Sequence, residues 1–223
     1  RPPQAESLAK LKQALDAAPE MLTQERDVPA VLATLKAQFP KLEDFEREFP
    51  SLCFALATGV GKTRLMGAFI AYLHLAHGIN NFFVLAPNLT IYNKLITDFT
   101  PNTPKYVFKG IGEFAIHAPR VITGDNYDQQ NITGGELLGE VRINISKINS
   151  EVRGGREPRI KRMKEVLGDS YFNHLANLPD LVLLMDESHR YRAQAGMRAI
   201  NELKPLFGLE VTATPFVEAN PKP

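Results

Sequence analysis

The sequence predicts an α/β protein in which helices cover both faces of a mostly parallel sheet. From residue 52 onward, short apolar runs such as "CFALAT", "FFVLAP" and "LVLLMDE" alternate with segments of helical periodicity. This alternation is typical of parallel strands joined by crossover helices. The hydrophobic content of 44% over 223 residues is sufficient for one large domain with a buried core.

A helical segment is expected to precede the sheet. Leu8, Leu11 and Leu15 recur every three or four residues, and "VPAVLATLKAQF" continues the pattern. We therefore divide the chain into a helical lead-in, residues 1–50, and a sheet domain, residues 51–223.

Three helices are predicted within the sheet domain. The first follows "TGVGKT" and has Gly78 as its stop. A second runs from about residue 89 to 99 and ends at "TPNTP", and a third carries Met197, Ile200 and Leu203 on one face. The apolar stripe of the first helix consists of Leu65, Met66, Phe69, Ile70 and Leu73.

Charge and cysteine content exclude several classes of protein. Lys and Arg total 26 against 25 Asp and Glu, a net charge of +1, so any site for a polyanion must be local. Cys53 is the single cysteine, which excludes internal disulfides and zinc sites with paired cysteines. No apolar run approaches the roughly 20 residues that span a bilayer, and the chain does not open on a signal peptide. We expect a cytoplasmic protein with no membrane partner.

The segment "TGVGKT" lies between an apolar strand and an amphipathic helix, which predicts a phosphate-binding loop. The glycines allow successive N–H groups to point at a phosphate. Lys62 is expected to reach the β- and γ-phosphates and Thr63 to bind magnesium. The usual pattern opens with glycine where this chain has Leu56. The residues expected at the nucleotide are Thr58, Gly59, Val60, Gly61, Lys62, Thr63 and Arg64.

The second motif is acidic and follows the apolar run "LVLLM". Asp186 and Glu187 end this strand, where α/β sheets place their ligands. We expect Asp186 to hold magnesium through water, and Glu187 to orient and deprotonate the attacking water. With Lys62, these are the predicted catalytic residues. The alternative is that both carboxylates only cap the following helix.

The motifs "TGVGKT", "APNLT", "DESH" and "TATP", in this order, resemble the first RecA-like domain of superfamily 2 DEAD/DEAH-type helicases and translocases. Members of that superfamily commonly lack the first glycine of the loop. Longer stretches within residues 50–216 are similar to the motor region of the type III restriction enzyme nuclease (Res) subunit and its bacterial relatives. The resemblance implies a RecA-like P-loop NTPase domain that binds ATP and Mg²⁺ and acts as a DNA-dependent ATPase.

The same resemblance assigns further roles. His189, Thr212 and Thr214 would couple hydrolysis to strand movement. The opening "RPPQ" is similar to the adenine-reading motif, in which Gln4 pairs with the adenine edge and Arg1 lies nearby. A surface glutamine after a proline turn is the alternative for Gln4.

The resemblance also places DNA along the domain. Contacts to the strand backbone give affinity without reading sequence. "NISKI" departs from the usual threonine-containing form of the family. The residues expected at the nucleic acid are Asn88, Thr90, Asn144, Ser146 and Lys147.

Weaker signals remain open. An insertion is predicted between about 100 and 178, and its basic stretch 153–164 suits either a phosphate-binding strip or a solvated helix start. His74 and His77 have the spacing of a metal-binding pair, but packing or surface roles are favoured because no third ligand is evident. No nuclease motif is present.

A second RecA-like domain is expected to complete the motor. The sequence reaches "FVEANPKP" soon after the third motif, so that domain, with its arginine finger, is expected elsewhere in a full-length chain. These residues alone are expected to bind ATP but to hydrolyse it very slowly. A modification or specificity subunit is a further expected partner. The alternatives are a repair or defence helicase without restriction activity, and a nucleotide-gated switch that binds DNA or protein.

Overall fold

The computed structural model describes residues 2–57, 59–127, 140–147, 168–187 and 194–213, without the side chains of 194–197. The lead-in contains α1 (Pro2–Ala17), the 3-10 helix η1 (Pro19–Leu22) and α2 (Val28–Gln38). The described strands are β1 (Ser51–Ala55), β2 (Asn81–Ala86), β3 (Arg120–Ile122), β4 (Arg142–Lys147), β5 (Leu181–Asp186) and β6 (Phe207–Thr212). The remaining described helices are α3 (Lys62–His77), α4 (Leu89–Phe99), α5 (Gly112–Ile116), α8 (Asp169–Ala176) and α9 (Gln194–Glu202).

The described strands form one sheet in the order β1-β6-β5-β2-β4-β3, and every pairing among them is parallel. All positions of β2, β5 and β6 are buried, as expected for parallel strands that are covered on both faces. The predicted fold class is confirmed.

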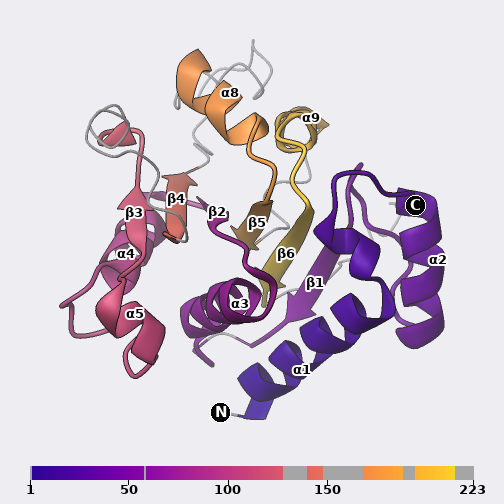
Figure 1. Cartoon of the computed structure of the whole chain (residues 1–223), viewed down its shortest axis with the longest axis horizontal. Coiled ribbons are helices and arrows are strands. Elements are labelled where there is room, and N and C mark those ends of the chain that lie inside the picture. Colours follow the sequence, from indigo (N-terminus) through magenta and orange to yellow (C-terminus); the bar gives the residue numbers. More distant parts are fainter. Residues whose placement is uncertain (1, 58, 128–139, 148–167, 188–193, 214–223) are drawn as a thin grey trace, which may run out of the picture.

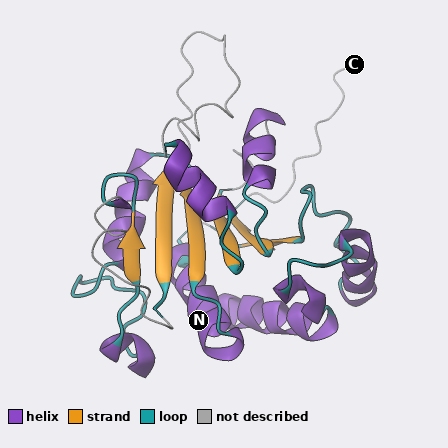
Figure 2. Ribbon diagram, turned by 45° about the horizontal axis from the view of Figure 1, so that its top comes forward, coloured by secondary structure: helices purple, strands orange, loops and turns teal. Residues whose placement is uncertain are grey.

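Helices lie on both sides of this sheet (Figure 1). Alternate residues of β2 point to opposite faces. Phe82 and Val84 join a core with α1, α2, α3 and α4, whereas Phe83 and Leu85 join one with α8 and α9. Figure 2 shows the sheet between these two layers.

Helix α3 follows the sequence prediction closely. Its predicted apolar stripe is fully buried, and Gly78 ends the helix with a φ of 68°, a left-handed conformation that glycine adopts easily. Helix α4 also has its predicted bounds, and the Asn88 side chain caps it by accepting a hydrogen bond from the Ile91 N–H at 2.9 Å.

The interval predicted to hold an insertion contributes to the sheet. Between about 100 and 178 the described residues include α5, β3, β4 and α8. Strands β4 and β3 extend the sheet beyond β2. The basic stretch 153–164 lies outside the described residues.

A buried ion pair fastens the end of the lead-in to β6. The Arg47 Nε lies 3.3 Å from the Glu210 Oε1, and the exposed fractions of the two side chains are 0% and 6%. The Ser51 hydroxyl also donates to the Glu210 Oε1, at 2.8 Å. Glu210 can therefore be buried in β6 because Arg47 of the lead-in supplies the opposite charge.

We expect Glu210→Ala to lower the free energy of unfolding by about 3–5 kcal/mol, because it leaves the Arg47 guanidinium buried without its anion. Urea denaturation of the purified protein measures this loss. Glu43→Ala is the matched control, since Glu43 is exposed, and the double variant Arg47→Met/Glu210→Leu should recover most of the stability. A loss below about 1 kcal/mol for Glu210→Ala would contradict this account of the pair.

Candidate nucleotide-binding site

Three neighbouring strands bring the predicted motifs to one edge of the sheet. Strand β6 pairs with β1 and β5, and Thr212 stands opposite Ala55. The Leu56 N–H donates to the Thr212 carbonyl and the Glu187 N–H to the Val211 carbonyl, each at 2.9 Å. The loops that follow the three strands therefore meet where parallel sheets bind ligands.

Lys62 lies between the two acidic residues. Its ammonium forms an ion pair with the Glu187 carboxylate and lies 3.9 Å from the Asp186 Oδ1. The exposed fractions of the Lys62, Asp186 and Glu187 side chains are 14%, 10% and 21%. One cation facing two partly enclosed carboxylates leaves a net negative site, which favours a further cation.

Glu187 is oriented from both sides. The Thr212 hydroxyl donates to the Glu187 Oε2 at 3.2 Å, while Lys62 holds the Oε1. The φ of Glu187 is 52°, a left-handed conformation that is uncommon for glutamate. Sequence reasoning had linked Thr212 to hydrolysis through the resemblance, and the structure brings it to the predicted base.

The backbone of the predicted phosphate loop favours glycine at two positions. Gly59 and Gly61 have φ values of 79° and 94°, and both lie in the left-handed region. At Gly61 a Cβ atom would also lie 2.6 Å from the Gln4 Nε2. The loop is therefore shaped partly by a residue of the lead-in.

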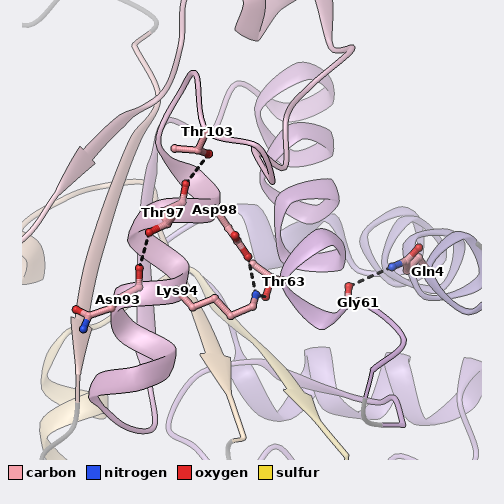
Figure 3. Close-up of polar contacts among 8 residues, drawn as sticks. All are labelled: Gln4, Gly61, Thr63, Asn93, Lys94, Thr97, Asp98 and Thr103. Carbon is pink, nitrogen blue, oxygen red and sulfur yellow. Dashed lines mark hydrogen bonds and ion pairs between the residues drawn. The ribbon is translucent and has the colours of Figure 1, made fainter.

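Gln4 reaches the phosphate loop from the start of α1. Its Nε2 donates to the Val60 carbonyl at 2.9 Å and to the Gly61 carbonyl at 3.1 Å, and Figure 3 shows its side chain directed at Gly61. Gln4 thus belongs to a helix that contacts the loop, rather than to a separate surface turn. Arg64 is exposed on the first turn of α3.

Thr63 has a partner that sequence reasoning missed. The Lys94 ammonium donates to the Thr63 Oγ1 at 2.8 Å and to the Asp98 Oδ2 at 2.5 Å (Figure 3). The only sequence signal for this network is the i,i+4 spacing of Lys94 and Asp98 on a predicted helix, which does not indicate contact with Thr63.

The donors at this edge fit magnesium. The Thr63 hydroxyl and the Asp186 carboxylate are hard oxygen ligands, which Mg²⁺ prefers. Within the described ranges there is no group of three or more His, Cys, Asp or Glu side chains suited to a metal. At nucleotide sites, phosphate oxygens and water commonly supply the other ligands of Mg²⁺.

The residues predicted to contact DNA divide into two groups. Asn88 and the exposed Thr90 lie at the N-terminus of α4, and the Lys147 ammonium at the end of β4 lies 5.9 Å from the centre of the Tyr92 ring. Asn88 and Thr90 follow β2, and Lys147 is the last residue of the adjacent strand β4.

The other two lie inside the sheet. Asn144 is 3% exposed; its amide donates to the Phe82 carbonyl at 3.2 Å and accepts from the Tyr171 hydroxyl at 2.8 Å. Burial raises the pKa of Tyr171, which keeps that hydroxyl a donor. Ser146 is 5% exposed. Asn144 therefore joins β4 to its neighbours, and neither side chain presents a surface to a strand of DNA.

Several predicted residues fall outside the described part of the chain: Arg1, Thr58, His189 and Thr214. The two histidines of α3 are engaged separately. The His74 Nδ1 lies 2.9 Å from the Asn80 Oδ1, and the His77 Nε2 lies 3.2 Å from the Tyr72 hydroxyl, which agrees with packing roles. Among the described helices, none has the length and apolar character to cross a bilayer.

Comparisons with known proteins give one family. The model of the family "Type III restriction enzyme, res subunit" matches residues 1–217. Among solved structures, a similar one is a nuclease-deletion mutant of the Type ISP restriction-modification enzyme LlaGI in complex with a DNA substrate mimic, at 14% identity and a TM-score of 0.47. That match covers 86% of this chain but only 18% of the LlaGI chain. No curated protein matches this sequence.

Proposed function

Because this chain belongs to the type III restriction enzyme res-subunit family, we propose that it is the ATP- and magnesium-binding motor domain of a DNA-dependent ATPase. The observation that carries the proposal is the meeting of Lys62, Glu187 and Thr212 at one edge of the sheet. A positively charged loop residue, a carboxylate base and a hydroxyl that orients it are the groups that nucleotide hydrolysis requires.

Each residue has a role in this proposal. Lys62 leaves Glu187 to bind the β- and γ-phosphates, and the freed carboxylate then orients a water molecule for attack. Thr63 and Asp186 would hold the magnesium ion, which would supply positive charge to neutralise the phosphates. Gln4 would contact the base of the nucleotide, and its hydrogen bonds to the loop carbonyls support this role by keeping the start of α1 beside the loop.

We propose that DNA lies across the carboxyl ends of β2 and β4. Asn88, Thr90 and Lys147 supply polar groups there, and contacts of this kind bind phosphate and sugar without distinguishing bases. Thr212 contacts Glu187, the proposed catalytic base, and lies at the end of β6 in the same sheet. Its position supports a link between ATP hydrolysis and movement of the DNA strand. In the whole protein, a second RecA-like domain and a modification or specificity subunit would act with this domain.

The direct test is a titration with a fluorescent, non-hydrolysable ATP analogue, with and without Mg²⁺, followed by phosphate release from the intact protein with and without DNA. We expect magnesium-dependent binding and DNA-stimulated release. Absence of binding at millimolar analogue would refute the proposal. Hydrolysis that DNA does not change would limit it to the nucleotide site.

We further expect binding of single-stranded DNA to be weak, indifferent to sequence and strongly dependent on salt, because phosphate contacts dominate. Each phosphate that a lysine or arginine neutralises should lower the affinity for single-stranded DNA about two- to threefold between 50 and 200 mM salt. Lys147→Ala should flatten this dependence, whereas Lys41→Ala, which removes an exposed lysine of the lead-in, should not. Base-specific binding that ignores salt would contradict this placement of DNA.

A further inference from the structure

Lys94 donates a hydrogen bond to the hydroxyl group that the proposed magnesium site uses as a ligand. The ammonium of Lys94 donates to the Thr63 Oγ1 at 2.8 Å. Thr63 lies on the first turn of α3, next to the phosphate-binding Lys62. A hydroxyl oxygen that accepts a hydrogen bond from one cation is a poorer ligand for a second cation.

Lys94 is tethered on its other side. Its ammonium lies 2.5 Å from the Asp98 Oδ2, and the exposed fractions of the Lys94 and Asp98 side chains are 45% and 7%. A buried carboxylate needs a partner, so Asp98 keeps Lys94 in place even when Thr63 has another ligand. Lys94 can therefore release Thr63 without losing its counter-ion.

The end of α4 that carries this pair is anchored to α3. The Val107 N–H donates to the Asp98 carbonyl at 2.9 Å, and a Cβ atom on Gly67 of α3 would lie 2.9 Å from Val107. The Thr103 hydroxyl closes the turn on the Thr97 carbonyl at 2.8 Å (Figure 3). Lys94 therefore approaches Thr63 from a firmly packed base.

An ammonium ion and a divalent cation that both contacted this hydroxyl would lie about 4 Å apart and would repel each other. Thr63 must therefore exchange Lys94 for the metal. At low magnesium concentration the Thr63 hydroxyl would contact Lys94, and at high magnesium concentration it would be a ligand of the metal.

On this basis, and resting on the proposed function, we propose that Lys94 is a positioning residue that competes with magnesium for the Thr63 hydroxyl. The Lys94–Asp98 pair thereby sets the magnesium concentration that is needed for half-saturation of nucleotide binding. The contact also joins the magnesium site to α4, whose N-terminus carries Asn88 and Thr90.

The experiment is a magnesium titration of the intact protein at a fixed, subsaturating concentration of a fluorescent ATP analogue. Lys94→Met should lower the magnesium concentration at half-saturation about five- to tenfold, since one charge-assisted hydrogen bond no longer competes. Lys94→Arg, which keeps a cationic donor, should restore a value near that of the wild type. In EDTA, Lys94→Met should leave the affinity for the analogue unchanged.

Two further variants separate competition from simple charge and from misfolding. The double variant Lys94→Met/Asp98→Asn leaves the net charge unchanged and no unpaired carboxylate, so it should show the same shift as Lys94→Met. Lys105→Met removes an exposed lysine beyond α4 and should behave as the wild type.

The outcomes distinguish competition for the Thr63 hydroxyl from other roles of Lys94 and from failure of the proposed function. A half-saturation that Lys94→Met and the charge-balanced variant leave unchanged would overturn the competition, with the nucleotide site intact. Weaker analogue binding in EDTA would overturn it too, because Lys94 would then be a phosphate ligand. If the wild type binds no nucleotide at any magnesium concentration, the proposed function itself fails, and this inference with it.

Discussion

Replacement of Lys62 by alanine is expected to weaken binding of a non-hydrolysable ATP analogue by about a hundredfold or more, because the variant loses charge-assisted bonds to the β- and γ-phosphates. The structure adds a second reason. Lys62 is the cation that faces Glu187 and Asp186, so its loss leaves two carboxylates to repel the incoming triphosphate. Equilibrium titration at saturating magnesium measures the change.

The matched control for Lys62→Ala is Lys105→Ala, which removes one positive charge from an exposed position. Urea denaturation of both variants should show that the fold is retained. Wild-type affinity in Lys62→Ala would mean that the loop is not the phosphate site, and the proposed function would lose its main support.

Replacement of Glu187 by glutamine is expected to reduce DNA-stimulated hydrolysis by the intact protein by about 10²–10⁴-fold while nucleotide binding is retained. Glutamine still accepts a hydrogen bond from Thr212, but it cannot take a proton from water. Phosphate release and analogue binding, measured on the same preparations, separate the two effects. Glu43→Gln, at an exposed position, is the control.

An unchanged hydrolysis rate in Glu187→Gln would refute its role as the base. In that case the chain would be better described as a nucleotide-gated switch, which binds ATP without turning it over efficiently. Loss of binding in Glu187→Gln would point instead to a structural role for the Lys62–Glu187 pair.

Sequence patterns were sufficient for the fold because they reflect local physical constraints. Strands buried on both faces must be apolar throughout, and the helix after "TGVGKT" must carry one apolar stripe. The ordered motifs also identified the family, and the match over residues 1–217 confirms that resemblance. Lys62 and Glu187, both predicted at the nucleotide, lie in contact, because the parallel strands of one sheet end at the same edge.

Contacts between distant residues were beyond sequence reasoning. Asn144 and Ser146 follow the motif order, but the strand that carries them is buried, and Asn144 bonds to a neighbouring strand and to Tyr171. Lys94 could not be placed at Thr63 from its helical spacing alone. The pairing of Arg47 with Glu210 likewise depends on how the lead-in returns to β6, which periodicity does not specify.

The position of β1 at the edge of the sheet bears on the order in which the protein becomes functional during synthesis. Among the described strands, β1 pairs only with β6, and the bond between Ser51 and Glu210 spans 159 residues. Contacts of such long range form late, because closing a large loop must precede them. We therefore expect β1, the strand before the predicted phosphate loop, to complete its pairing only after β6 has left the ribosome. If the proposed nucleotide site is correct, a nascent chain that ends before Thr212 carries the whole "TGVGKT" motif and yet should not retain ATP.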